Sequence, residues 1–538
     1  MTRYEEKSKT WHGPIRPSIL NPEANFGQVI LNLLARTPDK IIQIDADTGR
    51  EMTCAEMSRR IVRVAMNLTK QVDHLKLGDL VSLVCCNSEN VVPVFVGCLA
   101  IGLAVNPLAP VFNKDDLAHM MRQSQSKVVF CDEDNRMVVE EATREAISDC
   151  NTRIFVMGEA AGSARSVNDL LAPVDGENSF EPKYLGDSKK LMAMVLCSSG
   201  TTGLPKGVCL SHAHLIEGDV FANDLDAGPI FNFSPLFWAT GMFAMLTSLY
   251  CSRARVITSK SFTEETLISI IERYKVEDIF TPPAYISVLQ SHPKFSTADF
   301  GSIKRWTMGG ALVSEELRTC LGSRFPNGVA KPVYGSSEIG FITLGTGPFA
   351  PGSVGTLANN LEAKIVDEEG RRKGPGETGE IRVKYKHKFL GYLNNAESTR
   401  DAFDEEGFFK TGDVGYFDQY GFLYVIDRIK DIIKYKNYQI SPSDLEAVIE
   451  QIDGVKQVCV CGIPVADRSS DLPTAMIVRH AGSSLTEEQV VAIVDGQVSD
   501  HKKLRGGVYF VQQLPTSAAG KVLRRSVKQL IVDQTVSK

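Results

Sequence analysis

A ten-residue run from Ser198 to Gly207, SSGTTGLPKG, constrains this chain more than any other segment. It follows Leu191–Leu196, an apolar stretch that we expect to be a buried strand. Glycines let a backbone approach an anion, adjacent N–H groups form a concave nest, hydroxyls add donors and Lys206 adds charge. The spacing differs from the Walker pattern. The run therefore predicts a phosphate-binding loop, and the alternative is an ordinary polar loop between a strand and a helix.

Four further motifs follow the glycine-rich run. They are Tyr334–Glu338 (YGSSE), Thr411–Gly415 (TGDVG), Asp427–Lys434 (DRIKDIIK) and Gly520–Lys521. In order and spacing they resemble the adenylate-forming superfamily of acyl-CoA synthetases, 4-coumarate–CoA ligases and beetle luciferases. The resemblance spans nearly the whole chain, and Thr411–Lys436 and His501–Gly507 are especially similar to the ligase and luciferase branch.

Length and composition agree with a large protein that has more than one core. The 538 residues are 43% hydrophobic and 23% charged, which suggests two or more domains. The formal net charge of −6 gives no basic footprint for nucleic acid. The twelve cysteines show no CxxC pairing, and Cys197, Cys209, Cys459 and Cys461 fall in expected strands. We expect reduced, structural thiols and an intracellular protein.

The ends of the chain bear on its location. Residues 1–10 have no apolar signal core, so we expect no secretion. The resemblance implies a peroxisomal location, but the last residues, Val536-Ser537-Lys538, differ from the Ser-Lys-Leu address, and the cytoplasm is the alternative. Val91–Phe112 is almost uncharged and long enough to span a bilayer. Prolines interrupt it, and the resemblance implies a buried helix, a strand and a loop there, so we expect no transmembrane segment.

The alternation of elements predicts an α/β fold. Ala254–Thr258 reads as a strand, Ser261 and Glu264 form a capping-box pattern before a helix, and Asp278–Phe280 reads as the next strand. Such alternation favours parallel sheets.

The pattern changes towards the end of the chain. Gly421–Ile426 predicts a short strand, Pro442 opens a helix, and Val458–Gly462 predicts another strand; we place the boundary at 428–431. The resemblance implies a large N-terminal domain (1–428) of stacked α/β subdomains with a β-barrel-like part. It also implies a small mobile α+β C-terminal domain (429–538), with its hinge near Lys430.

The resemblance implies that the chain activates a carboxylate with ATP. The attack on the α-phosphorus meets a charged triphosphate, so the site must neutralise oxygens and hold the reactants in line. Lys206 and the loop would hold the β- and γ-phosphates, Ser337 the α-phosphate, and Glu338 a magnesium ion. The residues expected to bind ATP or CoA are Ser198, Ser199, Gly200, Thr201, Thr202, Gly203, Lys206, Gly310, Ala311, Tyr334, Gly335, Ser337, Asp413, Arg428, Lys436 and Asn437. Among these, Tyr334 and Gly335 would face adenine, and Asp413, assisted by Arg428, the ribose.

Two lysines would serve different half-reactions. By resemblance Lys521 contacts the reacting carboxylate and the α-phosphate, whereas Lys434 reaches the adenylate from the opposite face of the C-terminal domain after rotation about Lys430. The expected catalytic residues are Lys521, Lys434, Glu338, Ser337 and Lys206, with Glu338 the only expected metal ligand.

Three positions depart from the family pattern. Trp238 stands where the family has a histidine, and an indole lacks the switchable donor and acceptor of an imidazole. Asn437 replaces a glycine near the path of the pantetheine arm. Phe341 follows the Glu338 motif where luciferases have small residues. The expected acid pocket comprises Trp238, Thr240, Gly309, Gly310, Phe341 and Ile342.

Three functions are consistent with these residues. The first is an ATP-, magnesium- and CoA-dependent acyl-CoA synthetase acting on a medium- or long-chain fatty acid or an aryl-propenoic acid. The second is an enzyme whose adenylate meets another fate, including luciferin oxygenation, against which Trp238, Thr240 and Phe341 argue. The third is a catalytically weak binding protein that retains the fold. The expected partners are a small carboxylic acid and CoA.

Overall fold

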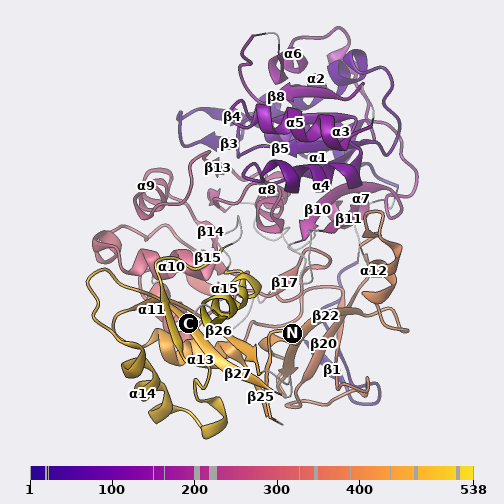
Figure 1. Ribbon diagram of the computed structural model, residues 1–538. Coiled ribbons are helices and arrows are strands. Elements are labelled where there is room, and N and C mark those ends of the chain that lie inside the picture. Colours follow the sequence, from indigo (N-terminus) through magenta and orange to yellow (C-terminus); the bar gives the residue numbers. More distant parts are fainter. Residues whose placement is uncertain are drawn as a thin grey trace.

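The computed structural model describes residues 2–17, 21, 23–148, 151–162, 164–198, 206–216, 227–325, 327–344, 349–387, 389–436, 438–465, 470–516 and 522–536 (Figure 1). Its helices of five or more residues are α1 (Phe26–Arg36), α2 (Cys54–Gln71), α3 (Val91–Ala100), α4 (Lys114–Ser124), α5 (Arg136–Ala146), α6 (Val167–Leu171), α7 (His212–Ile216), α8 (Ala239–Cys251), α9 (Glu264–Tyr274), α10 (Pro283–Gln290), α11 (Glu315–Gly322), α12 (Ala396–Asp401), α13 (Pro442–Glu450), α14 (Glu487–Gln497) and α15 (Arg524–Val536).

An eight-stranded sheet lies in the upper part of Figure 1. Its order is β21 (Gly391–Tyr392), β11 (Lys206–Ser211), β10 (Met192–Ser198), β6 (Ala104–Pro107), β5 (Leu80–Val84), β7 (Val128–Cys131), β8 (Arg153–Val156) and β9 (Arg165–Ser166). The strands from β10 to β9 are parallel, and β11 and β21 continue the sheet antiparallel.

A seven-stranded sheet carries the parallel strands that matter most for the site. Its order is β16 (Val329–Pro332), β15 (Arg305–Met308), β14 (Asp278–Thr281), β12 (Ile230–Phe231), β13 (Arg255–Ile257), β3 (Ile41–Asp45) and β4 (Glu51–Thr53). The strands from β16 to β3 are parallel, and β4 returns antiparallel to β3. A separate apolar core packs beneath it, with Trp306 and Phe325 stacked at its centre.

A third, antiparallel sheet forms the lower right of Figure 1. Its order is β1 (Arg3–Glu5), β2 (Thr10–His12), β19 (Leu361–Val366), β20 (Gly379–Tyr385), β22 (Phe409–Phe417) and β23 (Leu423–Arg428). The N-terminal hairpin β1–β2 forms one edge of this sheet, where the fully buried Trp11 of β2 stacks on Phe417 of β22. A two-stranded hairpin, β17 (Gly335–Ser336) and β18 (Gly340–Phe341), lies beside it.

The last part of the chain, gold in Figure 1, has its own apolar core. Its strands are β24 (Ile433–Tyr435), β25 (Tyr438–Ile440), β26 (Val455–Pro464), β27 (Asp471–Arg479) and β28 (Val508–Val511). Helix α13 packs on β26, and α14 on β28. The fold is thus α/β, with mixed sheets and a C-terminal α+β domain, as the resemblance implied.

The structure confirms most of the expected elements. The expected strands at 191–196, 254–258, 278–280 and 458–462 are β10, β13, β14 and β26, and Pro442 opens α13 after the capping residue Ser441. The apolar stretch at 91–112 contains the fully buried helix α3, followed by β6. Among the described residues, no helix is both long and apolar enough to cross a bilayer. Each described cysteine is a free thiol.

Three features differ in detail from what the sequence predicted. Ser261 does not cap α9, because Thr263 accepts the Thr266 N–H and the helix begins at Glu264. The strand expected at 421–426 is shifted to Leu423–Arg428. The element after the glycine-rich run is a strand and not a helix, since β11 pairs antiparallel with β10 and Ser198 lies opposite Lys206.

Candidate active site

A cavity of about 1180 Å³ opens at the carboxyl ends of the parallel strands in the seven-stranded sheet. The segments after β12, β13, β14 and β15 all line it, including Trp238, Phe262, Tyr285 and Gly310. Ligands of open α/β sheets bind at this edge, because the loops there converge while the strands below stay rigid. The cavity is therefore the candidate site for an acid substrate.

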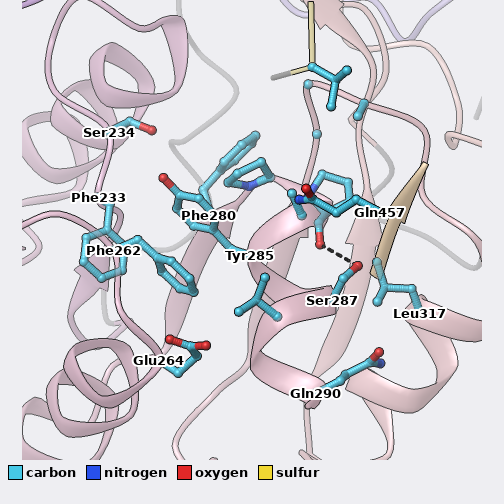
Figure 2. Close-up of a pocket in the computed structure, with 18 of the residues that line it drawn as sticks. Phe233, Ser234, Phe262, Glu264, Phe280, Tyr285, Ser287, Gln290, Leu317 and Gln457 are labelled. Carbon is cyan, nitrogen blue, oxygen red and sulfur yellow. Dashed lines mark hydrogen bonds between the residues drawn. The ribbon is translucent and has the colours of Figure 1, made fainter. Parts of the chain in front are cut away.

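Aromatic rings form one wall of the cavity (Figure 2). Phe262 and Tyr285 stack with centroids 3.9 Å apart and planes 13° apart. Phe233 meets Phe262 and Tyr285 edge-on at 5.5 and 6.2 Å. This arrangement presents a rigid apolar surface, and Figure 2 also shows Phe280 beside Tyr285. The wall suits an apolar or aromatic ligand.

The C-terminal domain supplies the opposite side of the cavity. Gln457 and Cys459 from β26, with Val522 and Arg524, are among its lining residues. Arg524 donates to the carbonyl oxygen of Val460 and to the carboxylate of Glu446 on α13. Arg524 thereby fixes the start of α15 against β26, at the mouth of the cavity.

A group of three side chains around the buried Asp413 joins three of the sequence motifs. The hydroxyl of Tyr334 donates to Oδ2 of Asp413 at 2.6 Å, and Arg428 Nε lies 3.2 Å from Asp413 Oδ1. Asp413 and Arg428 are opposite each other in the β22–β23 pairing, which explains their contact. Burial and the Asp413 charge raise the pKa of Tyr334 well above its usual value, so its hydroxyl remains a donor. The three predicted nucleoside-binding residues lie together.

The β17–β18 hairpin presents the next predicted residues. In this hairpin Gly335 pairs with Phe341 and Ser336 pairs with Gly340. Ser337 and Glu338 lie in the turn that connects the two strands. A Cβ at Gly335 would stand 2.3 Å from the Gly340 carbonyl oxygen, so this position needs glycine. Only 9% of Glu338 is exposed, and one carboxylate oxygen accepts the Tyr392 hydroxyl at 2.8 Å.

Lys206 lies near the same tyrosine. Its Nζ donates to Ser398 Oγ at 3.1 Å and lies 5.2 Å from the centroid of the Tyr392 ring. The predicted loop residues Ser199, Gly200, Thr201, Thr202 and Gly203 lie outside the described residues, and of Ser198 only the backbone is described. Tyr392 therefore links Lys206 to Glu338, although no sequence motif identified it.

The expected acid-pocket residues divide into two groups. Trp238, Thr240, Gly309 and Gly310 line the cavity, as does Ala311. Phe341 and Ile342 are not among its lining residues: Ile342 is fully buried in the core, and Phe341 stacks on Phe243 at 4.1 Å. Phe341 is 6.4 Å from Phe280, which does line the cavity, so any influence on the acid would be transmitted through that ring.

Lys434, expected to reach the adenylate after rotation, and Lys436, an expected ATP- or CoA-binding residue, lie elsewhere. Lys434 is exposed on β24, Lys436 follows it with φ 51°, and neither lines the cavity. The Lys436 N–H donates to Ser470 Oγ at 2.8 Å. Asn437 and Lys521 lie outside the described residues, but Val522, the residue after Lys521, lines the cavity.

The donor set fits a magnesium–nucleotide complex rather than a protein-enclosed metal. The described residues contain no cluster of three or more His, Cys, Asp or Glu side chains with metal-ligand geometry. Magnesium is commonly held by one or two carboxylates together with substrate phosphates and water. The buried carboxylate of Glu338 is the candidate for such a protein ligand.

Sequence reasoning missed the aromatic wall, Tyr392 and Asn87. The wall could have been found, because Phe262 and Tyr285 follow two expected strands whose carboxyl ends share one sheet edge. Asn87 lines the cavity and donates to the carbonyl oxygens of Phe233 and Ser234 at 3.3 and 3.4 Å. No local pattern marks Tyr392 or Asn87, since their partners are distant in sequence.

Comparison with known proteins agrees with this geometry. The family model described as "AMP-binding enzyme" matches residues 32–393, and the model for the C-terminal domain of the same enzymes matches residues 444–521. A probable 4-coumarate–CoA ligase of Dictyostelium discoideum is 29% identical over 97% of this chain and 98% of its own length. A luciferin 4-monooxygenase of Photinus pyralis is 30% identical over 93% of this chain and 92% of its own.

The solved structures show the same fold. ATP-bound MatB from Rhodopseudomonas palustris superposes with a TM-score of 0.85 at 24% identity, covering 96% of this chain and 99% of that one. The anthranilate CoA ligase AuaEII has a TM-score of 0.86 at 21% identity, with the same coverage of 96% and 99%. Because the family models match most of its length and the predicted nucleoside-binding residues lie together, the chain belongs to the AMP-binding enzymes of the adenylate-forming superfamily.

Proposed function

We propose that the chain is an ATP-dependent acyl-CoA synthetase. In the first half-reaction a carboxylic acid and ATP give acyl-AMP and pyrophosphate, and in the second acyl-AMP and CoA give acyl-CoA and AMP. The observation that carries this proposal is that Tyr334 and Arg428 both bond to the carboxylate of Asp413, and that Tyr334 directly precedes the hairpin bearing Glu338. Relatives named as 4-coumarate–CoA ligases support the choice of CoA as acceptor.

The charged residues of the site would bind different parts of the nucleotide. Asp413 accepts hydrogen bonds from the ribose hydroxyls, while Arg428 and Tyr334 fix its carboxylate. Lys206 and the glycine-rich loop neutralise the terminal phosphates, and Ser337 reaches the α-phosphate. A magnesium ion, held by Glu338, would supply charge neutralisation on the phosphate oxygens. The acid lies in the cavity with its carboxylate directed towards Gly310 and the hairpin.

The cavity favours medium- or long-chain fatty acids or aryl-propenoic acids. Its volume of about 1180 Å³ and its stacked rings accommodate a long apolar or planar chain. Trp238 adds to this apolar lining in place of the family histidine. The second half-reaction would use Lys434, Lys436 and Asn437 after the C-terminal domain (429–538) rotates about Lys430, since the described members of that face lie away from the cavity.

A panel of acids tests the proposal directly. Pyrophosphate release and thioester formation would be measured with fatty and aryl-propenoic acids, each with and without CoA. The expected result is pyrophosphate release with at least one such acid and stoichiometric thioester when CoA is present. Adenylation without thioester would indicate another fate of the adenylate, including the oxygenation suggested by the luciferase relatives. Nucleotide or acid binding without pyrophosphate release would indicate a binding protein.

A further inference from the structure

Tyr392 contacts two residues that we assign to different parts of the metal–nucleotide complex. Its hydroxyl donates to Oε1 of Glu338 at 2.8 Å, and the ammonium of Lys206 lies 5.2 Å from the centroid of its ring. Glu338 belongs to the β17–β18 hairpin, and Lys206 begins β11. One side chain therefore bridges two separate elements of the site.

The backbone fixes Tyr392 between these elements. Tyr392 pairs with Val208 of β11, two residues beyond Lys206, so both lie on the same strand face as Lys206. The Tyr392 N–H donates to Thr399 Oγ1 at 2.9 Å. Gly391 has φ 126°, and a Cβ there would come within 2.9 Å of the Thr399 side chain. Glycine at 391 thus leaves room for Thr399 of α12 to approach and bond to the Tyr392 backbone.

The start of α12 also holds the lysine. Ser398 Oγ accepts the Lys206 ammonium at 3.1 Å, and the neighbouring Thr399 holds the Tyr392 backbone. Asn395 caps this helix by accepting the Ser398 N–H at 2.9 Å. The positions of Lys206 and Tyr392 are therefore set by one short helical turn.

The chemistry of the tyrosine suits both of its neighbours. A buried carboxylate requires hydrogen-bond donors, and the Tyr392 hydroxyl supplies one to Glu338 at 2.8 Å. The face of the ring attracts a cation. Within the described residues, the ammonium of Lys206 bonds to Ser398, and the Glu338 carboxylate to Tyr392, rather than to each other.

We propose that Tyr392 is a positioning residue that holds Lys206 and Glu338 apart and in fixed orientation. Its hydroxyl turns the carboxylate so that the remaining oxygen faces the metal of a metal–nucleotide complex, and its ring supports the ammonium that faces the terminal phosphates. Without the phenol between them, the two opposite charges could pair and neutralise each other. This inference rests on the proposed function, because it assumes that the site binds ATP with a divalent cation.

The test measures how much magnesium strengthens ATP binding. Calorimetric titration with ATP in EDTA and with ATP in excess magnesium gives two dissociation constants, and their ratio is the metal gain. Tyr392→Phe keeps the ring and removes only the donor, so the metal gain should fall by roughly 10-fold while the affinity for metal-free ATP stays unchanged. Tyr392→Leu should weaken metal-free ATP as well. In a Glu338→Gln background, Tyr392→Phe should have no further effect on the metal gain.

Tyr250→Phe is the matched control. The Tyr250 hydroxyl donates to the Leu215 carbonyl oxygen at 3.1 Å, and Tyr250 does not line the cavity. This variant should change the melting temperature as much as Tyr392→Phe does but leave the metal gain intact. If Tyr392→Phe does not fold, Tyr392→Met takes its place; because it lacks the ring as well as the donor, it should lower both the metal gain and the affinity for metal-free ATP.

The possible failures are distinguishable. A wild-type protein that binds no ATP with or without magnesium would overturn the proposed function itself. A wild-type protein with a clear metal gain that Tyr392→Phe leaves unchanged would overturn only the role of Tyr392. An equal loss of both affinities in Tyr392→Phe would show that the tyrosine supports the fold of the site generally, and it too would contradict the proposal.

Discussion

The phenol oxygen of Tyr334 lies 2.6 Å from Oδ2 of Asp413, which connects the segment after β16 to the β22–β23 pair of a different sheet. Arg428 contacts the other carboxylate oxygen of Asp413 at 3.2 Å. The carboxylate is thus held from two sides while only 7% of the residue remains exposed. Such a preorganised acceptor pair suits two adjacent hydroxyls of a ribose.

Removing the Tyr334 hydroxyl should loosen this carboxylate. Hydrogen bonds to charged groups contribute about 1.5–3 kcal/mol, so Tyr334→Phe should raise the KM for ATP ~10-fold or more, with a smaller effect on the KM for the acid. Pyrophosphate exchange at saturating acid measures both constants. Tyr250→Phe should change neither. An unchanged KM for ATP in Tyr334→Phe would show that Asp413 does not need this donor or does not bind the nucleotide.

Many of the strands could be predicted from the sequence because they depend on local patterns. Alternating apolar segments predicted β10, β13, β14 and β26, whereas the family resemblance implied that residues as distant as Tyr334 and Asp413 serve one site. The contact itself depends on two sheets packing together, which no local pattern encodes.

The features that the sequence did not predict correctly also have physical explanations. Ser261 and Thr263 both offer a capping hydroxyl, and Thr263 caps α9 while Phe262 packs into the aromatic wall, outside the helix. Tyr392 was missed because its role depends on Lys206 and Glu338, which only the folded chain brings to it. Tertiary packing, rather than propensity, decides such positions.

Asn87 should control the shape of the acid pocket. Its Oδ1 accepts the buried Arg255 Nη2 at 3.0 Å, and its Nδ2 donates to the carbonyl oxygens of the segment that leads to Trp238. Asn87→Ala releases this segment, so the KM for the acid should rise ~3- to 10-fold, since small misplacements in a site are costly. The KM for ATP should not change.

Asn67→Ala provides the control for this variant. The Asn67 amide donates to the carbonyl oxygens of Leu170 and Ala172 at 3.0 and 2.9 Å, and it does not line the cavity. Both variants should lose about 1–3 kcal/mol of stability through buried carbonyls left unpaired. If the two variants raise the KM for the acid equally, the effect is general loosening and Asn87 has no specific role.

Buried histidines should make the fold acid-sensitive. Burial lowers the pKa of His212 to about 4, and its Nδ1 accepts the Phe26 N–H at 3.2 Å, so the folded state keeps it neutral. An unfolded histidine has a pKa of about 6.5. Between these values the unfolded state binds more protons, so the free energy of unfolding falls as pH drops from about 6.5 to about 4, by ~1.4 kcal/mol per pH unit. Above about 6.5 this histidine contributes no pH dependence.

His212→Gln keeps an acceptor for Phe26 and removes the titration. Urea unfolding between about pH 4.5 and 7.5 should therefore show a slope smaller by about one proton than in the wild type. Burial also lowers the pKa of His214 to about 4, so His214→Gln should reduce the slope similarly, and the double variant by about two protons. Equal slopes in all four proteins would mean that these histidines become protonated without unfolding.

The two lysines of the C-terminal domain should affect different half-reactions. Val522, the residue after Lys521, and the nearby Arg524 are among the residues that line the cavity, whereas Lys434 is exposed on β24 and absent from the lining. Lys521 would meet the charge that develops when the carboxylate attacks ATP, and the loss of one preorganised contact of that kind costs ~10²-fold or more. The Lys521→Ala variant should therefore lose most acyl-AMP formation. It should still convert supplied acyl-AMP and CoA to thioester at nearly the wild-type rate. Lys434→Ala should lose mainly thioester formation. Single-turnover assays with ATP and acid, or with synthetic acyl-AMP and CoA, separate the two steps, and an equal slowing of both by Lys521→Ala would exclude alternation of the two faces in this chain.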